Sequence, residues 1–209
     1  MRLLIFGASG KTGSEIVRQA LDKGHSVSAF VRDPSRLSVE HSSLRVLAGN
    51  VGEAAVIAEA VVGQDAVVSA LGVGVPLKHD EDVIAGIRNI VRAMEDQAVF
   101  RFIYLSFIGV RESRHAAGFV LRYVAPLPLR HEIADHELKE EVVRGSRLDW
   151  TIVRPPKLTV GPRTGTYRSG ENISTGKLLP TLSRADVADF ILQELADPRY
   201  VRKAPRLLP

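Results

Sequence analysis

The feature that most constrains this chain is a run of three glycines between a short apolar segment and an amphipathic one. Residues 2–6 are RLLIF, Gly7, Gly10 and Gly13 follow at three-residue spacing, and residues 14–23 place their apolar side chains on one helical face. An apolar run of this length predicts a strand, and the later periodicity predicts a helix. The segment therefore predicts strand, tight turn and helix, the unit that opens a dinucleotide-binding βαβ fold.

A competing interpretation of the same turn is a P-loop, because Gly10-Lys11-Thr12 matches the end of that motif. A P-loop needs a glycine five residues before the Gly-Lys-Thr step, and Ile5 occupies that position. It also needs a later apolar strand that ends in aspartate to bind Mg²⁺, and neither VVSALG nor FIYLSF ends in this way. These two differences favour a dinucleotide-binding turn.

The glycine spacing is G-x-x-G-x-x-G rather than the G-x-G-x-x-G of the simplest fingerprint. The physical requirement is the same, because residues without a Cβ let backbone amides approach a pyrophosphate at the positive end of a helix. The alternative is a tight turn that binds no ligand. We expect cofactor contacts along the whole turn, from Gly7, Ser9, Gly10, Lys11, Thr12 and Gly13.

The alternation of apolar runs and helical segments continues along the chain. Further strands are predicted over residues 26–31, 44–49, 65–71, 101–106 and 149–154. Further helices are predicted over residues 53–62, 81–96, 131–145 and 184–196. Parallel neighbours need helical crossovers, and such a sheet must be covered on both faces. We therefore predict an α/β fold of the Rossmann type, a doubly wound parallel sheet in three layers with strand order 3-2-1-4-5-6.

The length of 209 residues fits a single nucleotide-binding domain over residues 1–209. The pattern loosens after the fifth predicted strand, and segments of about 107–145 and 155–183 are expected to form the substrate cleft. The tail after Pro198 is expected to be peripheral.

Composition excludes several classes of function. The chain carries 28 basic and 24 acidic residues, and its basic residues are not interleaved with aromatics, so nucleic-acid binding is not expected. No apolar run approaches the roughly 18 residues of a membrane span, and the first strand leaves no room for a signal peptide, so we expect a cytoplasmic protein with no membrane contact. The absence of cysteine excludes disulfides and thiolate metal sites. A monomer is slightly favoured.

Two arginines near the second strand bear on the choice of cofactor. Arg32 lies nineteen residues after Gly13, where an NAD site would place an acidic residue on the ribose hydroxyls. Arginine there suits a 2′-phosphate, and Arg36 could join it, so NADP(H) is preferred over NAD(H). The alternative is that both arginines are solvated or paired with Asp33.

The remaining cofactor contacts follow from the predicted strand order. The first and fourth strands flank the crevice, so Ala70, Leu71 and Gly72 are expected to line the path from pyrophosphate to nicotinamide. Asn50 and Val51 follow the third strand and are expected near the adenine.

Seven segments together resemble the atypical short-chain dehydrogenase/reductases. They are, in chain order, GASGKTG, FVRDPSRL, GNV, QDAVVSALG, FIYLS, LDWTIVRPP and SRADVADFIL. Within that family, the chain is most similar to the NAD(P)H-binding group that includes biliverdin-IXβ reductase, also called flavin reductase. The resemblance implies a Rossmann fold, NADPH as hydride donor, and a flavin, quinone or bilin-like acceptor in an open cleft.

The chain departs from the family at several positions. The larger superfamily uses a tyrosine and a lysine four residues later, and Glu132 and His136 occupy those places here. Ser106 matches a serine that follows the fifth strand, whereas Phe107 replaces a second hydroxyl of the flavin-reductase-like members. The missing tyrosine counts against alcohol or sugar oxidation, which needs a positioned acid or base. A flavin or quinone can take its proton from water.

The resemblance also suggests residues around the acceptor. Pro155 and Pro156 match a Pro-Pro pair beside the nicotinamide, and Lys157 stands where some members have histidine. Ser106, His136 and Lys157 are the candidate catalytic residues, and Ser106 is also a candidate cofactor-binding residue that could hydrogen-bond the nicotinamide carboxamide or the acceptor. Each has a simpler alternative: a capping serine, a structural histidine, and an exposed loop lysine.

No metal site is expected. The segment HEIADH resembles a zinc-protease motif, but its histidines are five residues apart and diverge by about 140° around a helix.

Two classes of function remain. The first is an NADPH-dependent reductase of a flavin, quinone or bilin-like acceptor. The second is a non-catalytic NADP(H) sensor that reports the cofactor's redox state to a partner, and a nucleotide-sugar epimerase-like enzyme is less favoured because Glu132 replaces the tyrosine.

Overall fold

The computed structural model describes residues 1–72, 81–116 and 130–209. Its centre is a parallel sheet of six strands in the order β3-β2-β1-β4-β5-β6, as the sequence predicts. The strands are β1 (Arg2–Phe6), β2 (Ser26–Val31), β3 (Leu44–Ala48), β4 (Ala66–Ser69), β5 (Arg101–Leu105) and β6 (Asp149–Val153). The helices are α1 (Lys11–Asp22), α2 (Ala54–Val61), α3 (Glu81–Asp96), α4 (Arg130–Arg144) and α5 (Arg184–Ala196).

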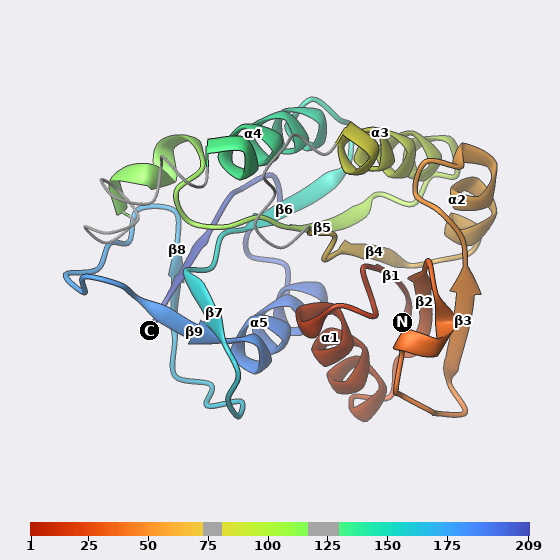
Figure 1. Ribbon diagram of the computed structural model, residues 1–209, viewed down its shortest axis with the longest axis horizontal. Coiled ribbons are helices and arrows are strands. Elements are labelled where there is room, and N and C mark those ends of the chain that lie inside the picture. Colours follow the sequence, from red (N-terminus) through yellow and green to blue (C-terminus); the bar gives the residue numbers. More distant parts are fainter. Residues whose placement is uncertain (73–80, 117–129) are drawn as a thin grey trace.

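The helices cover both faces of the sheet, which makes three layers. In Figure 1, α1 and α5 lie below the sheet, and α2, α3 and α4 lie above it. The strands are apolar throughout because both of their faces are buried. In β1, Leu3 and Ile5 pack on the side of α1 and α5, whereas Leu4 and Phe6 pack on the opposite side. The predicted α/β Rossmann-type fold is therefore confirmed.

Two short sheets follow the main one, and sequence analysis did not predict them. One joins β7 (Lys157–Thr159) to β9 (Thr181–Ser183), and the other joins β8 (Arg168–Gly170) to β10 (Arg206–Leu208). Three-residue strands carry too little periodicity to be recognised from sequence alone. They lie at the end of the sheet where the predicted cleft segment 155–183 runs (Figure 1).

The expectation that the tail after Pro198 is peripheral is wrong. Leu207 and Leu208 are fully buried. The tail runs beside β6: the Ile152 amide donates to the carbonyl of Lys203 at 3.0 Å, and the amide of Arg154, directly after the strand, donates to the carbonyl of Pro205 at 2.9 Å. The tail therefore covers an edge of the sheet that would otherwise present unpaired backbone groups.

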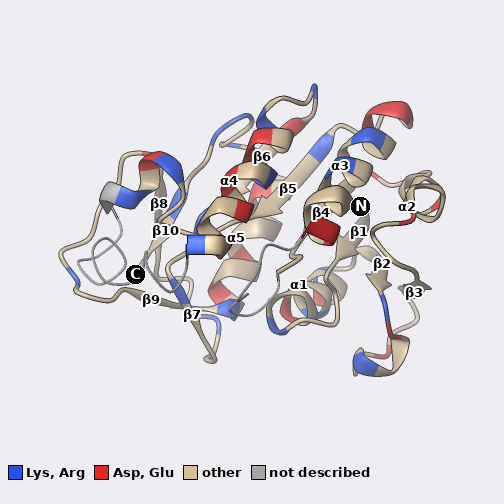
Figure 2. Cartoon of the chain, turned by 45° about the horizontal axis from the view of Figure 1, so that its top comes forward, with Lys and Arg blue, Asp and Glu red and all other residues tan. Residues whose placement is uncertain are grey.

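Two short 3₁₀ helices lie near the strand ends. η1 (Pro34–Arg36) follows β2, and η2 (Arg111–Ala116) follows β5. Part of the predicted cleft segment 107–145 lies outside the described residues, since residues 117–129 are not among them. In the view of Figure 2, basic residues are spread over several elements and alternate with acidic ones along α3 and α4.

Candidate functional site

A cleft of about 260 Å³ opens where β1, β2 and β4 end. β2 lies on one side of β1 and β4 lies on the other. The connection that follows β1 and the connection that leads to β4 therefore run toward opposite edges of the sheet. Such a switch point leaves a crevice outside the strand ends. Ten of the residues predicted to bind cofactor line this cleft: Gly7, Ser9, Gly10, Arg32, Arg36, Asn50, Val51, Ala70, Leu71 and Gly72.

The glycine turn packs so tightly that two of its positions have no space for a side chain. Gly7 has φ +74°, and a Cβ there would lie 2.6 Å from the carbonyl oxygen of Ala70. A Cβ on Gly13 would lie 2.0 Å from the carbonyl oxygen of Gly7. Gly7 and Gly13 thus let β1, β4 and α1 approach one another. Gly13 does not line the cleft, so its role is in this packing.

Gly10 lines the cleft, as Gly7 does, but its surroundings are less crowded than those of Gly7 or Gly13. It precedes α1 with φ −76° and ψ 161°, an extended conformation that any residue can adopt. A Cβ there would have one close neighbour, the carbonyl oxygen of Gly7 at 3.2 Å. The absence of a side chain at Gly10 is therefore not required by the fold alone and keeps the backbone accessible from the cleft.

The first turn of α1 offers unpaired backbone donors beside the cleft. The first amide of this turn with a helical partner is that of Ser14, which donates to Gly10 at 2.8 Å. The amides of Lys11, Thr12 and Gly13 have no hydrogen bond in the described part of the chain, and the first turn contains no acidic residue. The apolar periodicity predicts this helix only from residue 14, whereas the helix begins at Lys11, so these residues belong to the helix and not to the turn. The open amides and the positive end of the helix fit a diphosphate.

Arg32 and Arg36 lie at the β2 end of the cleft with exposed side chains. Neither guanidinium forms a hydrogen bond or an ion pair within residues 1–72, 81–116 and 130–209. Asp33 does not neutralise them through an ion pair, because its carboxylate accepts hydrogen bonds from the amide and hydroxyl of Ser35, at 3.0 and 2.7 Å. These Ser35 hydrogen bonds hold the pKa of the Asp33 carboxyl below its usual value. Two unpaired cations therefore face the cleft.

Four residues of the cleft were not predicted from sequence: Phe30, Val31, Asp82 and Val83. Phe30 and Val31 end β2, directly before Arg32, so their position in the sequence could have assigned them to the cleft. Asp82 belongs to the first turn of α3, which is far from the glycine turn along the chain. Only the crossover after β4 brings Asp82 to the cleft, so no local pattern could have identified it.

Ser106 and Pro155 lie at the same end of the sheet as the cleft, after β5 and β6. Tyr104 pairs with Ser69 in the sheet, so Ser106 leaves β5 at the same end of the sheet at which Leu71 lines the cleft, although Ser106 is not itself part of that lining. The carbonyl of Pro155 accepts a hydrogen bond from the Ile108 amide at 2.8 Å. Pro155 and Pro156 are buried, and Lys157 begins β7 with an exposed side chain. Ser106 itself is 5% exposed, and its hydroxyl donates to the carboxylate of Glu140 at 2.7 Å.

His136 is buried on α4, and its Nδ1 lies 2.8 Å from the hydroxyl of Tyr104. Phe107, which replaces a hydroxyl residue of related proteins, packs edge-on against the imidazole with ring centroids 5.1 Å apart. Burial, and secondarily the charge of Lys139, holds the pKa of His136 well below its usual value. The imidazole is therefore neutral near pH 7, which fits the structural alternative for His136. Burial raises the pKa of the half-buried Glu132 carboxyl.

No group of three or more His, Cys, Asp or Glu side chains is arranged to hold a metal ion in the part of the chain that the structure covers.

None of the helices among the described residues combines the length and hydropathy that a bilayer span requires.

Comparisons with known proteins agree with this architecture. A family model described as NAD(P)H-binding matches residues 7–198. The uncharacterised protein YwnB of Bacillus subtilis is 30% identical over 207 residues, with 96% of this chain and 94% of YwnB covered. The crystal structure of the oxidoreductase ylbE from Lactococcus lactis superposes with a TM-score of 0.84 at 21% identity, covering 99% of this chain and 90% of ylbE. ChuY from Escherichia coli O157:H7, described as an anaerobillin reductase, superposes with a TM-score of 0.81 at 23% identity and covers 99% and 96% of the two chains.

Proposed function

This chain belongs to the NAD(P)H-binding family, and on that premise we propose that it is a reductase that uses NADPH to reduce a flavin, quinone or bilin-like acceptor. NADPH, when bound, supplies a hydride from C4 of its nicotinamide ring. The part of the protein is to hold the cofactor, to orient the acceptor, and to exclude competing reactions.

The observation that carries the proposal is the pair of unpaired guanidiniums in the same cleft as the glycine turn. The open amides of α1 would hold the diphosphate, and Arg32 with Arg36 would hold the 2′-phosphate that distinguishes NADPH from NADH. Asn50 and Val51, in the same cleft, would adjoin the adenine. A cation without a carboxylate partner at this position suits a phosphate better than a ribose diol.

The groups near the end of β5 support an acceptor that needs no proton donor from the protein. The Ser106 hydroxyl is committed to Glu140, and the His136 imidazole is neutral and bonded to Tyr104. Among the described residues at this edge, neither side chain is free to deliver a proton. Acceptors that take their proton from water, such as flavins and quinones, do not need such a donor. The name of ChuY, an anaerobillin reductase, supports a bilin as a further candidate, and Lys157 would attract anionic acceptors.

The commitment of Ser106 and His136 to internal hydrogen bonds also favours a second candidate, a sensor that binds NADP(H) without turning it over. A sensor would need the same cleft and the same arginines. The two candidates differ only in whether bound NADPH is consumed.

The test is an NADPH-oxidation assay, followed at 340 nm, against a flavin, a quinone and a bilin. Turnover that is lost in a folded Gly10→Val variant supports the reductase. Tight NADPH binding without turnover of any acceptor favours the sensor and contradicts the reductase.

A further inference from the structure

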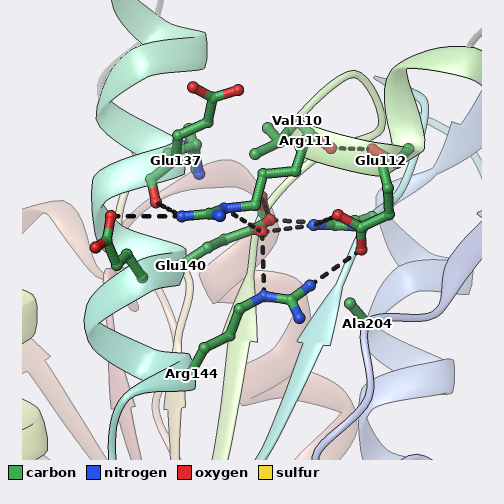
Figure 3. A network of polar contacts seen from close by, with 12 residues as sticks. Val110, Arg111, Glu112, Glu137, Glu140, Arg144 and Ala204 are labelled. Atoms are coloured by element: carbon green, nitrogen blue, oxygen red, sulfur yellow. Dashed lines mark hydrogen bonds and ion pairs between the residues drawn. The ribbon is translucent and has the colours of Figure 1, made fainter.

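Glu140 is a fully buried carboxylate on α4. Arg154, equally buried, donates to both of its oxygens, from Nε to Oε1 at 3.0 Å and from Nη2 to Oε2 at 2.5 Å. Two further guanidiniums approach Oε2, those of Arg144 at 3.9 Å and Arg111 at 4.0 Å (Figure 3). Because guanidinium groups only donate, both oxygens of Glu140 act as acceptors.

This arrangement decides the direction of the hydrogen bond to Ser106. The Ser106 Oγ lies 2.7 Å from Oε1 of Glu140, an oxygen that already accepts from Arg154. A serine hydroxyl has one proton to donate and two lone pairs that accept. The proton is directed to Glu140, so Ser106 can offer a ligand only its lone pairs.

Ser106 also lies on the side of the cleft that would receive the nicotinamide. The unpaired arginines mark the β2 side as the place of the 2′-phosphate, at the adenosine end of the dinucleotide. The other end must then cross β1 and β4 toward β5. Ser106 directly follows β5, the strand next to β4, at the same end of the sheet at which Leu71 follows β4 and lines the cleft. The one hydrogen-bond donor on a nicotinamide ring is the NH₂ of its carboxamide.

We propose that Glu140 is a positioning residue that fixes Ser106 as a hydrogen-bond acceptor for the carboxamide NH₂ of the bound nicotinamide. This inference rests on the proposed function, since it requires a nicotinamide dinucleotide in the cleft. Its consequence is that Ser106 orients the cofactor and does not protonate the acceptor.

The test is a binding cycle with NADP⁺ and its 3-acetylpyridine analogue, which has a methyl group in place of the amide NH₂ and keeps the carbonyl. Wild-type protein should bind NADP⁺ roughly three- to ten-fold more tightly than the analogue, the effect of one neutral hydrogen bond. In Ser106→Ala this preference should fall to about one, because its cause is removed. Ser146→Ala is the matched control, since its hydroxyl bonds only locally, to the Val143 carbonyl and the Leu148 amide.

Glu140→Ala should weaken the preference, because the Ser106 hydroxyl is then no longer held as an acceptor and can also turn its proton toward the ligand. Glu112→Ala should keep the preference, because Glu112 bonds Arg154 at 2.7 Å in the same network but forms no hydrogen bond with Ser106 among the described residues. Retention of the preference in folded Glu140→Ala overturns the role of Glu140. If that variant does not fold, Ser106→Ala still decides the polarity.

The outcomes separate this inference from the function on which it rests. NADP⁺ binding with an equal preference in wild type and Ser106→Ala overturns the inference and leaves the proposed function intact. Failure of wild-type protein to bind either nucleotide overturns both.

Discussion

Replacing Arg32 by alanine tests the claim that the cleft prefers NADPH over NADH. The Arg32 guanidinium lines the cleft and has no hydrogen-bond or ion-pair partner among the described residues. Its removal therefore leaves no other protein group without a partner. A hydrogen bond to a charged group contributes about 1.5–3 kcal/mol when sheltered from water. Arg32 is exposed, and solvent screening reduces this to roughly 1–1.5 kcal/mol, or about five- to ten-fold in affinity for NADPH.

The affinity for NADH should change by less than about two-fold, because NADH has no 2′-phosphate for Arg32 to contact. Arg36→Ala should act in the same direction, and the double variant should lose more affinity than either single variant, but not the product of the two factors, because both arginines would contact the same phosphate. The assay is isothermal titration calorimetry with NADPH and NADH at low and high salt. The difference between wild type and variants should shrink at high salt, since exposed charges are screened.

Arg92→Ala is the matched control. It removes the same charge from α3, where the side chain is 84% exposed and lies outside the cleft lining. Its NADPH affinity should stay close to that of the wild type. Equal losses for NADPH and NADH in Arg32→Ala, or an Arg92→Ala loss as large as that of Arg32→Ala, would refute the assignment of a 2′-phosphate site.

Three further predictions concern stability, each measured by chemical denaturation. Gly13→Ala should destabilise the protein by at least about 2 kcal/mol, because its Cβ would lie 2.0 Å from the Gly7 carbonyl oxygen, although the same change in an ordinary helix stabilises; a gain in stability would contradict this packing. The free energy of unfolding should fall as the pH drops below 6.5, the ordinary pKa of histidine, because the unfolded chain takes up a proton that buried His136 does not. This contribution amounts to at most about 1.4 kcal/mol per pH unit, and a His136→Gln variant with an unchanged pH slope would disprove it. Glu140→Ala should cost about 3–5 kcal/mol because it leaves buried Arg154 without its bidentate partner, and a loss below about 1 kcal/mol would show that the pair is not buried as described.

The sheet and its switch point could be predicted because they depend on local patterns. Short apolar runs, helical periodicity and glycine spacing are all visible within a few residues, and together they determine the strand order. The glycine turn, Arg32 and Arg36 could be assigned to the cleft for the same reason, because each stands at a fixed distance along the chain from a strand.

The groups beyond β4 could not be predicted in this way. The pairing of Ser106 with Glu140 joins residues 34 positions apart, and Asp82 reaches the cleft only through a crossover. The burial of the tail after Pro198 depends on an open edge at β6, which no sequence window contains. The family resemblance placed Ser106 at the site but did not indicate the direction of its hydrogen bond.

The most direct test of the central claim is calorimetric titration of NADPH into wild-type protein and the Gly10→Val variant. The extended backbone at Gly10 is open to any residue, and a Cβ there would lie 3.2 Å from the Gly7 carbonyl oxygen, so a small shift of the turn should let the variant fold, while its branched methyl groups would occupy the position of the diphosphate. Gly176→Val, at a position where a Cβ would have no neighbour within 4 Å, is the control. The account predicts binding to the wild type and the control and at least a hundred-fold loss, roughly 2.7 kcal/mol, in folded Gly10→Val. Unchanged NADPH affinity in that variant, or no heat with the wild type, would contradict it.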